Sequence, residues 1–472
     1  MSNRVQEDHQ TAQRSKPVAH RWLIGSLLLV VVASASTIFA GSSLPNPLQT
    51  LNRTGVLSTY STAGGIDLSN PFFQSLGTNG RSCFTCHQPT DGWSVTPEHI
   101  RTRFLMSSGN DPIFRPVDGA VCPSADVSSY SAKQSAYNLL LKKGLIRVSM
   151  AVPSGADFTI QDIQDPYNCP ETISSAPALY RRPLPSTNLG FLATVMWDGR
   201  ETYQGLTISD DLGQQAIDAT MGHAQASAPP ASDLVAKIVS FERALLTAQS
   251  FDHKAGLLTD AGATGGPINL SKQEFYLGIN DVLGHDPTGA KFNPAVFNLF
   301  DSWASATGRN AAVRQSVARG QALFNTLPII ITEVAGLNDL PGLLTVNGTC
   351  TTCHDTPNSG NHSLPLAINI GTTNYPTMPA LDISGLPVYT VACADGSQVQ
   401  VTDVGRAMVT GKCSDVGKLK GPILRGLAAR APYFHNGGAA TLMDVVNFYD
   451  QRFHLNLAAD QKADLAAFLQ TL

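Results

Sequence analysis

"CFTCH" at Cys83–His87 and "CTTCH" at Cys350–His354 are two copies of one pattern, Cys-x-x-Cys-His, with little else alike around them. Three kinds of chemistry use a Cys-x-x-Cys pair: a redox dithiol, a zinc site and the covalent attachment of haem. A redox dithiol needs a strand–turn–helix setting and no following histidine. A zinc site usually takes two separated pairs, and adjacent Cys-His geometry serves it poorly.

Covalent haem attachment uses all three residues of the pattern. Two thiols three positions apart reach the two vinyl groups of one porphyrin, and the next residue turns its imidazole toward the iron. Chance would give the pattern in only about three of a thousand chains of this composition. The sequence therefore predicts two covalently bound haem c groups, each in its own domain. The predicted attachment residues are Cys83, Cys86, Cys350 and Cys353, and the predicted iron ligands are His87 and His354.

The composition is that of a soluble globular protein. The hydrophobic fraction is 43%, the charged fraction is 14% and the net charge is −4, so the chain has no basic surplus and we do not expect nucleic acid as a partner. Sustained alternation of apolar and polar residues is rare, and glycine and proline are abundant. We therefore expect a mainly α fold with long loops.

Residues 1–40 have the features of an export segment. Their start is net positive, and an uncharged run extends from Trp22 to Ala40. Ala33-Ser34-Ala35 offers small residues for cleavage, so a signal peptide is expected. The run is also just long enough to be retained as a membrane anchor. Either way, we expect the rest of the chain to lie in the periplasm, and to contact the membrane only if this segment is retained.

The remaining chain is expected to form two haem c domains. The first covers 41–305, with an insertion at about 100–176, and the second covers 306–472, with an insertion at about 388–414. Helices are predicted over 232–249 and 313–327. Four cysteines lie outside the two motifs, and in an exported protein they are expected to form disulfides. Pairing neighbours along the chain predicts one disulfide in each insertion, Cys122–Cys169 and Cys393–Cys413. Four buried thiols are the alternative.

Three further stretches resemble the bacterial di-haem cytochrome c peroxidase family. They are "WDGRE" (197–201), "FERALLT" (241–247) and "GKLKGPILRGLAARAPYFHNGGAATLMDVVNFYD" (417–450). The resemblance covers about two-thirds of the mature chain, leaving the two insertions outside it. The family includes the methylamine-utilisation enzyme MauG, which oxidises a partner protein.

The resemblance implies that peroxide reacts at the first haem and that the second haem supplies electrons. It places Trp197 between the two haems. The alternative is that Trp197 is an ordinary buried indole, a description that would fit Trp93 or Trp303 as well. It also implies that Tyr449, fourteen residues after the histidine of "PYFH", is the sixth ligand of the second iron, as in MauG. Met443 is the alternative ligand.

The chain departs from the family around the first haem. The position of the family's displaceable distal histidine is Ser174, which implies an open iron, and the position of its acidic catalytic residue is Thr220. His223 is the candidate acid–base group for splitting peroxide; a sixth iron ligand or a surface residue are the alternatives. Arg182 and Arg430 stand where the resemblance places the family's calcium ligands. A guanidinium repels Ca²⁺, so these two residues argue against a calcium ion that the family would otherwise imply.

The leading hypothesis is therefore an exported di-haem oxidoreductase. It would reduce hydrogen peroxide at the His87 haem with electrons relayed from the His354 haem, and a small cytochrome or cupredoxin would be the electron donor. One alternative is MauG-like oxidation of a protein or organic substrate through high-valent haems. The other is a non-enzymatic electron carrier, if His223 or Met221 closes the first iron.

Overall fold

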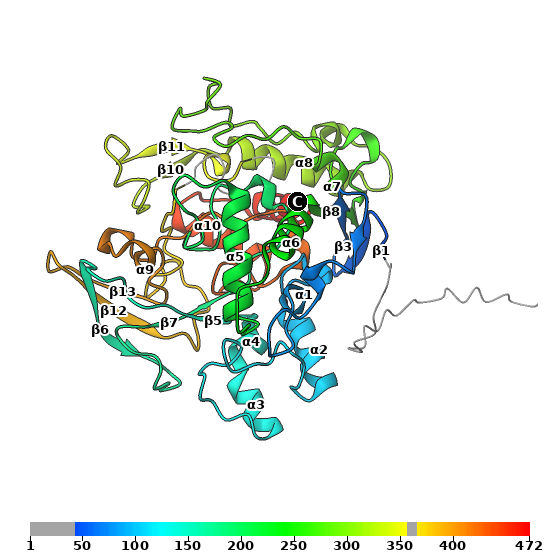
Figure 1. The fold of residues 1–472 in the computed structure, drawn as a ribbon. Coiled ribbons are helices and arrows are strands. Elements are labelled where there is room, and N and C mark those ends of the chain that lie inside the picture. Colours follow the sequence, from blue (N-terminus) through cyan, green and yellow to red (C-terminus); the bar gives the residue numbers. More distant parts are fainter. Residues whose placement is uncertain (1–42, 356–365) are drawn as a thin grey trace, which may run out of the picture. The chain divides into compact units, whose positions relative to one another are not determined.

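The computed structural model describes residues 43–355 and 366–472 (Figure 1). The predicted signal peptide or anchor, residues 1–40, lies outside the described residues. Within the described part, no helix has both the length and the apolar character needed to cross a bilayer. The described residues belong to one compact unit.

Short helices and short strands alternate along this unit. The helices are α1 (Cys83–Cys86), α2 (Pro97–Ser107), α3 (Tyr130–Ala136), α4 (Asn138–Lys143), α5 (Ile208–Gly222), α6 (Ser232–Ala244), α7 (Pro267–Leu270), α8 (Ala311–Thr326), α9 (Ala407–Thr410), α10 (Leu442–Arg452) and α11 (Ala459–Gln470). The strands are β1 (Ser43–Leu44), β2 (Leu48–Asn52), β3 (Gly55–Ser61), β4 (Ile66–Asp67), β5 (Ile146–Ser149), β6 (Phe158–Gln164), β7 (Ala178–Arg181), β8 (Leu245–Asp252), β9 (Gly256–Leu257), β10 (Ile329–Ile331), β11 (Val346–Gly348), β12 (Val388–Cys393) and β13 (Gln398–Val401).

The expectation of a mainly α fold is wrong. Of the described residues, 31% are helical and 16% lie in strands or bridges, and the strands form several small sheets. The fold is therefore mixed α and β. The long loops are present, but they connect sheets as well as helices.

The four-stranded sheet β2-β3-β8-β9 explains part of this error. In its centre, β3 pairs antiparallel with β8, and both strands are almost entirely buried. Polar side chains there are satisfied across the strands: Thr59 and Thr247 hydroxyls lie 2.9 Å apart, and Ser58 and Ser250 hydroxyls 2.7 Å apart. A strand covered on both faces does not alternate, so its sequence gives no strand pattern.

The helix predicted over 232–249 extends too far, because its last residues belong to a buried strand. Helix α6 ends at Ala244, and the chain continues directly as strand β8 from Leu245. By contrast, the helix predicted over 313–327 is confirmed as α8. Its apolar face packs against the C-terminal helix α11 in a core that also holds Phe297, Phe300 and Trp303.

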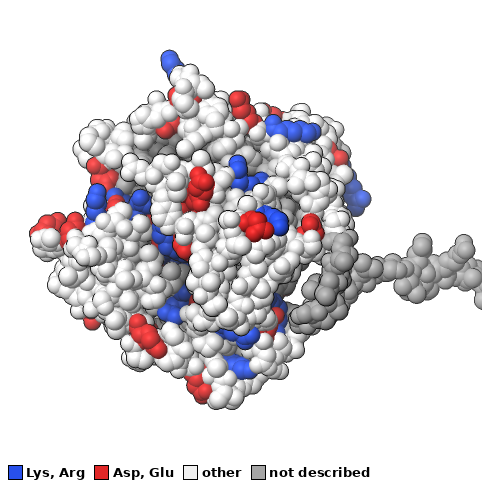
Figure 2. Space-filling model, viewed as in Figure 1, with Lys and Arg blue, Asp and Glu red and all other residues white. Residues whose placement is uncertain are grey.

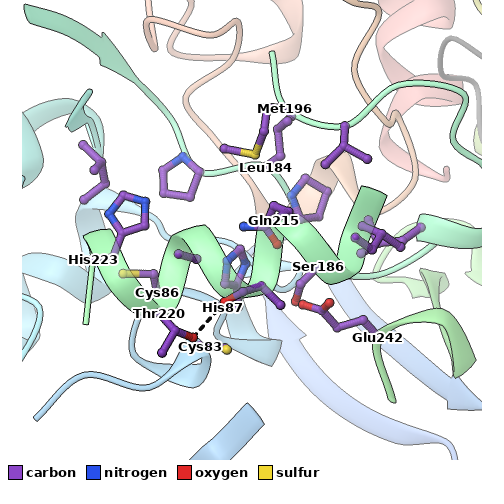
Figure 3. Close-up of a pocket in the computed structure, with 18 of the residues that line it drawn as sticks. Cys83, Cys86, His87, Leu184, Ser186, Met196, Gln215, Thr220, His223 and Glu242 are labelled. Carbon is purple, nitrogen blue, oxygen red and sulfur yellow. Dashed lines mark hydrogen bonds between the residues drawn. The ribbon is translucent and has the colours of Figure 1, made fainter. Parts of the chain in front are cut away.

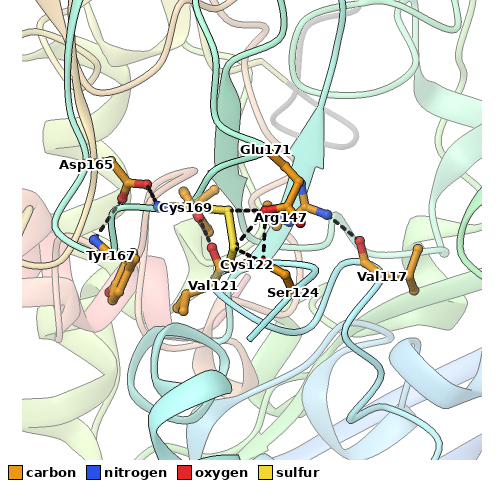
Figure 4. Close-up of a disulfide and its surroundings, with 10 residues drawn as sticks. Val117, Val121, Cys122, Ser124, Arg147, Asp165, Tyr167, Cys169 and Glu171 are labelled. Carbon is orange, nitrogen blue, oxygen red and sulfur yellow. Dashed lines mark hydrogen bonds between the residues drawn. A yellow bond between two sulfur atoms is a disulfide. The ribbon is translucent and has the colours of Figure 1, made fainter. Parts of the chain in front are cut away.

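The two predicted insertions are joined in space. Strand β6 of the first pairs antiparallel with β12 of the second, which also pairs with β13, so segments far apart in the chain make one three-stranded sheet. Both predicted disulfides are present, Cys122–Cys169 and Cys393–Cys413. Figure 4 shows the first with its surroundings: it ties Cys169 to the segment containing Val117 and Val121.

The surface is mixed in charge. On the face shown in Figure 2, lysine and arginine are interspersed with aspartate and glutamate among uncharged residues. Helix α5 runs down the middle of this face in Figure 1, between the sheet of the two insertions and helix α6. Helix α5 also lines a cavity that contains the first Cys-x-x-Cys-His motif.

Two helical glycines provide a test of the packing. A Cβ on Gly320 of α8 would lie 1.9 Å from the backbone oxygen of Asp464 in α11, so Gly320→Ala should lower the free energy of unfolding by about 1–3 kcal/mol. A Cβ on Gly213 of α5 would meet only the Val235 side chain, at 3.6 Å. Gly213→Ala should therefore raise the stability by up to about 1 kcal/mol. Urea unfolding of both variants measures the difference; equal effects would contradict the close approach of α8 and α11.

Candidate functional site

Two large cavities lie on either side of a common wall. They hold about 1420 and 1900 Å³ of empty space, open mouths included. One copy of the Cys-x-x-Cys-His pattern lines each cavity. The structure therefore provides room for a large group beside each motif.

The first cavity is built between three helices. Helix α1 supplies Cys83 and Cys86, followed by His87, and helix α6 supplies Ile238 and Glu242, one turn apart. Helix α5 and the residue that caps its C-terminus, His223, close the opposite side; the helix residues are Leu212, Gln215, Ala216, Ala219 and Thr220. Figure 3 shows His223 and Glu242 at opposite ends of the cavity, with His87 between them.

The imidazole of His87 is held in one orientation. Its Nδ1 donates to the backbone oxygen of Trp93 at 2.9 Å, and burial lowers the pKa of His87. The ring is therefore neutral, with Nδ1 engaged and Nε2 left as the coordinating nitrogen. Metal-binding histidines characteristically have their other ring nitrogen fixed by a hydrogen bond of this kind. Trp93 itself is fully buried, and its indole donates to the hydroxyl of Thr59 in strand β3.

The four cysteines of the two motifs are not in disulfides. Burial raises the pKa of Cys83, Cys86, Cys350 and Cys353. A redox dithiol works through a thiolate of lowered pKa, so these environments do not favour that chemistry. Two neutral thiols and one oriented imidazole on the wall of a large apolar cavity fit a covalently bound haem c.

His223 is part of a chain of polar contacts that begins beside the first motif. Its Nδ1 lies 2.5 Å from the carboxylate of Asp118, whose other oxygen accepts from Arg81 at 2.6 Å. Burial opposes ionisation of Asp118, but the hydrogen bond from His223 and the charge of Arg81 outweigh it and lower its pKa. Asp118 is therefore a carboxylate that holds His223, leaving Nε2 for the cavity.

Thr220 lines the same cavity but its hydroxyl is already used. It donates to the backbone oxygen of Ala216 within α5 at 2.8 Å. Ser174, the position of the family's distal histidine, is exposed and does not line the cavity. The histidines that line this cavity in the described part of the chain are His87 and His223.

Glu242 is a site residue that sequence reasoning missed. It belongs to the quoted stretch "FERALLT", but nothing in the pattern showed that its carboxyl faces a cavity. It is fully buried, and its Oε2 has no hydrogen-bond partner within the described part of the chain. Burial raises the pKa of Glu242 to about 8, so a neutral carboxylic acid lies beside the first motif.

The second cavity places Tyr449 opposite His354. The Tyr449 hydroxyl lies 3.4 Å from Nε2 of His354, and apolar side chains surround both groups. Burial raises the pKa of Tyr449. Met443, the alternative ligand, is 36% exposed and does not line the cavity. Of the two, Tyr449 is therefore the residue whose side chain faces the motif histidine.

Trp197 lies in the wall between the cavities and lines both. Its indole nitrogen donates to the backbone oxygen of Arg182, and its own backbone oxygen accepts from the backbone nitrogen of Lys420, each at 2.8 Å. Met196 and Gly199, on either side, adopt positive φ angles of 66° and 74°, which makes the tight turn that presents the indole. The other residues that line both cavities are Arg182, Pro183, Leu184, Pro185, Lys420 and Ile423.

A buried ionic network adjoins this wall. Arg181 bridges Asp198 at 2.5 Å and Asp403 at 2.7 Å, and all three side chains are almost completely buried. The ring of His435 lies 6.2 Å from that of Trp197, and burial lowers its pKa to about 4, so it is neutral. The network fixes the residue after Trp197 to strand β7 and to the segment after β13.

Arg182 and Arg430 lie side by side, and the Arg182 guanidinium donates a hydrogen bond to the backbone oxygen of Arg430. The Arg182 guanidinium donates to the backbone oxygens of Lys143, Val95 and Arg430 at 2.8, 2.8 and 3.0 Å. Carbonyl oxygens of this kind are calcium ligands in other proteins, but here they accept hydrogen bonds from an organic cation. The positions assigned to calcium binding thus hold a guanidinium.

Comparisons with known proteins agree with the resemblance in the sequence. The chain is similar to cytochrome-c peroxidases. It is 30% identical over 145 residues to the cytochrome-c peroxidase IdrP2 of Denitromonas iodatirespirans, covering 28% of this chain and 37% of the relative. It is 32% identical over 204 residues to the IdrP2 of Pseudomonas sp. (strain SCT), covering 41% and 48%. It is 43% identical over 70 residues to the cytochrome c551 peroxidase of Nitrosomonas europaea, covering 14% and 21%.

These matches are partial. The aligned part of the chain spans less than half the length of each of these relatives, and no family model matches. A solved structure of a MauG-like protein associated with microbial copper homeostasis aligns with 62% of this chain and 73% of its own at 19% identity. Its TM-score of 0.29 is too low to carry an argument.

The buried carboxyl of Glu242 makes stability depend on pH. Its pKa rises from about 4.5 to about 8 on folding, so the folded state retains a proton that the unfolded state loses between these values. The free energy of unfolding contributed by Glu242 therefore falls as pH rises, by about 1.4 kcal/mol per unit, until about pH 8.

Glu242→Gln should remove this part of the slope, which urea unfolding at pH 5, 6.5 and 8 would measure. Glu98→Gln, at an exposed glutamate of α2, is the matched control and should leave the slope unchanged. Identical slopes in wild type and Glu242→Gln would contradict a neutral Glu242.

Proposed function

We propose that this chain is a di-haem c-type oxidoreductase of the peroxidase kind, exported to the periplasm. It would reduce hydrogen peroxide at the first cavity with electrons that enter at the second. The observation that carries the proposal is the placement of one Cys-x-x-Cys-His motif in each of two cavities that share the Trp197 wall. The similarity to cytochrome-c peroxidases supports the same reaction class.

A bound haem would supply the iron on which peroxide is reduced; Cys83, Cys86 and His87 would hold it. Peroxide reduction takes two electrons and two protons and gives two molecules of water. His223 can accept a proton from the inner oxygen of peroxide at Nε2 and return it to the outer oxygen, which leaves as water. Asp118 and Arg81 are positioning residues, since they act by holding the His223 ring.

The second cavity would hold its haem through Cys350, Cys353 and His354, with Tyr449 on the opposite side. A small cytochrome or cupredoxin is the class of donor that would reduce it. Trp197 would then carry electrons across the wall, because an indole is oxidisable and this one excludes water from the space between the cavities. A phenolic ligand favours ferric iron, so the second haem would have a lower potential than one with methionine.

Purification from a host that attaches haem tests the proposal directly. The mass should exceed that of the processed polypeptide by two haem groups. The ferric protein should give one high-spin and one low-spin electron paramagnetic resonance signal, and it should oxidise a reduced cytochrome only when peroxide is added. A colourless product would overturn the proposal. Two low-spin signals would instead identify an electron carrier.

Replacement of His223 tests the acid–base assignment. His223→Ala should lower the kcat for peroxide by ~10²–10⁴-fold, because the group proposed to move the proton between the two oxygens is then lost. His253→Ala, at an exposed histidine outside both cavities, should leave the rate unchanged. An unchanged rate in His223→Ala would remove the assignment, and a change of the first haem from low to high spin would identify His223 as an iron ligand instead.

A second candidate function is MauG-like oxidation of a protein or organic substrate at a distance. The observation that favours it is Tyr449 facing His354, since Tyr is the ligand that the resemblance assigns to MauG. This function and peroxide reduction share the first steps. They differ in the reductant, so turnover without any cytochrome, but with a protein substrate consumed, would favour the second candidate.

A further inference from the structure

Lys420 is a buried lysine in the wall between the two cavities. The residue is 3% exposed, and its Nζ has no hydrogen bond within the described part of the chain. It lines both cavities, and its backbone nitrogen is fixed by the oxygen of Trp197 at 2.8 Å. An isolated ammonium in such a place is costly unless it loses its proton or meets an anion. Burial lowers the pKa of Lys420 to about 7 in the absence of that anion.

The buried carboxylates near the wall are already engaged. Asp198 accepts from Arg181 and also pairs with Arg200 at 3.2 Å, while Asp403 accepts from Arg181 through both of its oxygens. His435 is neutral. The network beside Trp197 therefore has no spare negative charge for Lys420.

Two more cations in the second cavity's wall lack a carboxylate partner in their hydrogen bonds. The guanidinium of Arg182 donates to three backbone oxygens, and that of Arg430 donates to the backbone oxygens of Gly426, Ile423 and Arg425. Burial lowers the pKa of both to about 10. The wall thus has an excess of positive charge that its own residues do not neutralise.

We propose that Lys420 binds a carboxylate of the group that occupies these cavities, namely a haem propionate at the wall beside Trp197. The inference rests on the proposed function, which supplies the haem. It adds an electrostatic role: the ammonium of Lys420 neutralises a carboxylate between the two sites and so sets the reduction potential of the haem that carries it. Lys420 is a binding residue and takes no part in proton transfer.

Lys420→Met removes the charge and keeps the length of the side chain. It should leave two haems attached and lower the reduction potential of at least one of them, because the propionate charge then stabilises ferric iron. A unit charge on the order of 10 Å from iron, at an effective dielectric constant of about 20, changes the ferric–ferrous equilibrium roughly tenfold. That factor corresponds to about 59 mV for a one-electron couple. Spectroelectrochemical titration measures it, and Lys420→Arg should stay near wild type.

Lys418→Met is the matched control. Lys418 is also buried and only two positions away, but it pairs with Asp339 at 3.0 Å and Asp415 at 3.4 Å, and it lines neither cavity. Its loss should leave both potentials unchanged. If the Met variant of Lys420 does not accumulate, Lys420→Gln makes the same comparison with a polar side chain.

The outcomes separate the two proposals. Unchanged potentials in a di-haem Lys420→Met protein, or equal shifts in Lys418→Met, would overturn the role of Lys420 and leave the proposed function intact. A wild-type protein without haem would overturn the proposed function itself, before any variant is made.

Discussion

The position of Trp197 depends on two hydrogen bonds, one from its indole and one to its backbone oxygen, that join three segments of the chain. Its indole donates to Arg182 at the end of β7, and its carbonyl accepts from Lys420, close to the last helices. These bonds and the Arg181 ion pairs hold together the wall on which both cavities depend. A looser wall would admit water and separate the cavities by a variable distance, and the electron transfer proposed between them would then lose its fixed path.

The first insertion contributes to this site. Asp118, the carboxylate that holds His223, lies within it and four residues before Cys122. The disulfide to Cys169, and the hydrogen bond from Arg147 to the backbone oxygen of Val117, restrain the segment that carries Asp118 (Figure 4). The insertion therefore has a structural reason to be disulfide-bonded: it must deliver one carboxylate to a defined place beside helix α5.

The sequence was informative where a local pattern carries the chemistry. Spacing alone predicted a haem site at each Cys-x-x-Cys-His motif, and each motif lines a cavity of its own. Cysteine pairing by neighbourhood predicted both disulfides. The strands β3 and β8 were missed because their buried hydroxyls pair with each other across the sheet, which no single strand reveals. Glu242 and Asp118 were missed because their importance lies in what they face after folding, and the pairing of β6 with β12 depends on residues more than two hundred positions apart.

The titratable residues that line the first cavity differ from those that line the second. At the first, Asp118 holds the ring of His223, the proposed acid–base group, and Glu242 adds a neutral acid beside the motif. At the second, apolar side chains surround Tyr449, and burial raises the pKa of its hydroxyl. Because peroxide reduction consumes protons and electron entry does not, this asymmetry supports the proposed assignment of peroxide to the first cavity and of electron entry to the second. Lys420, placed between them, would then affect the driving force for the transfer.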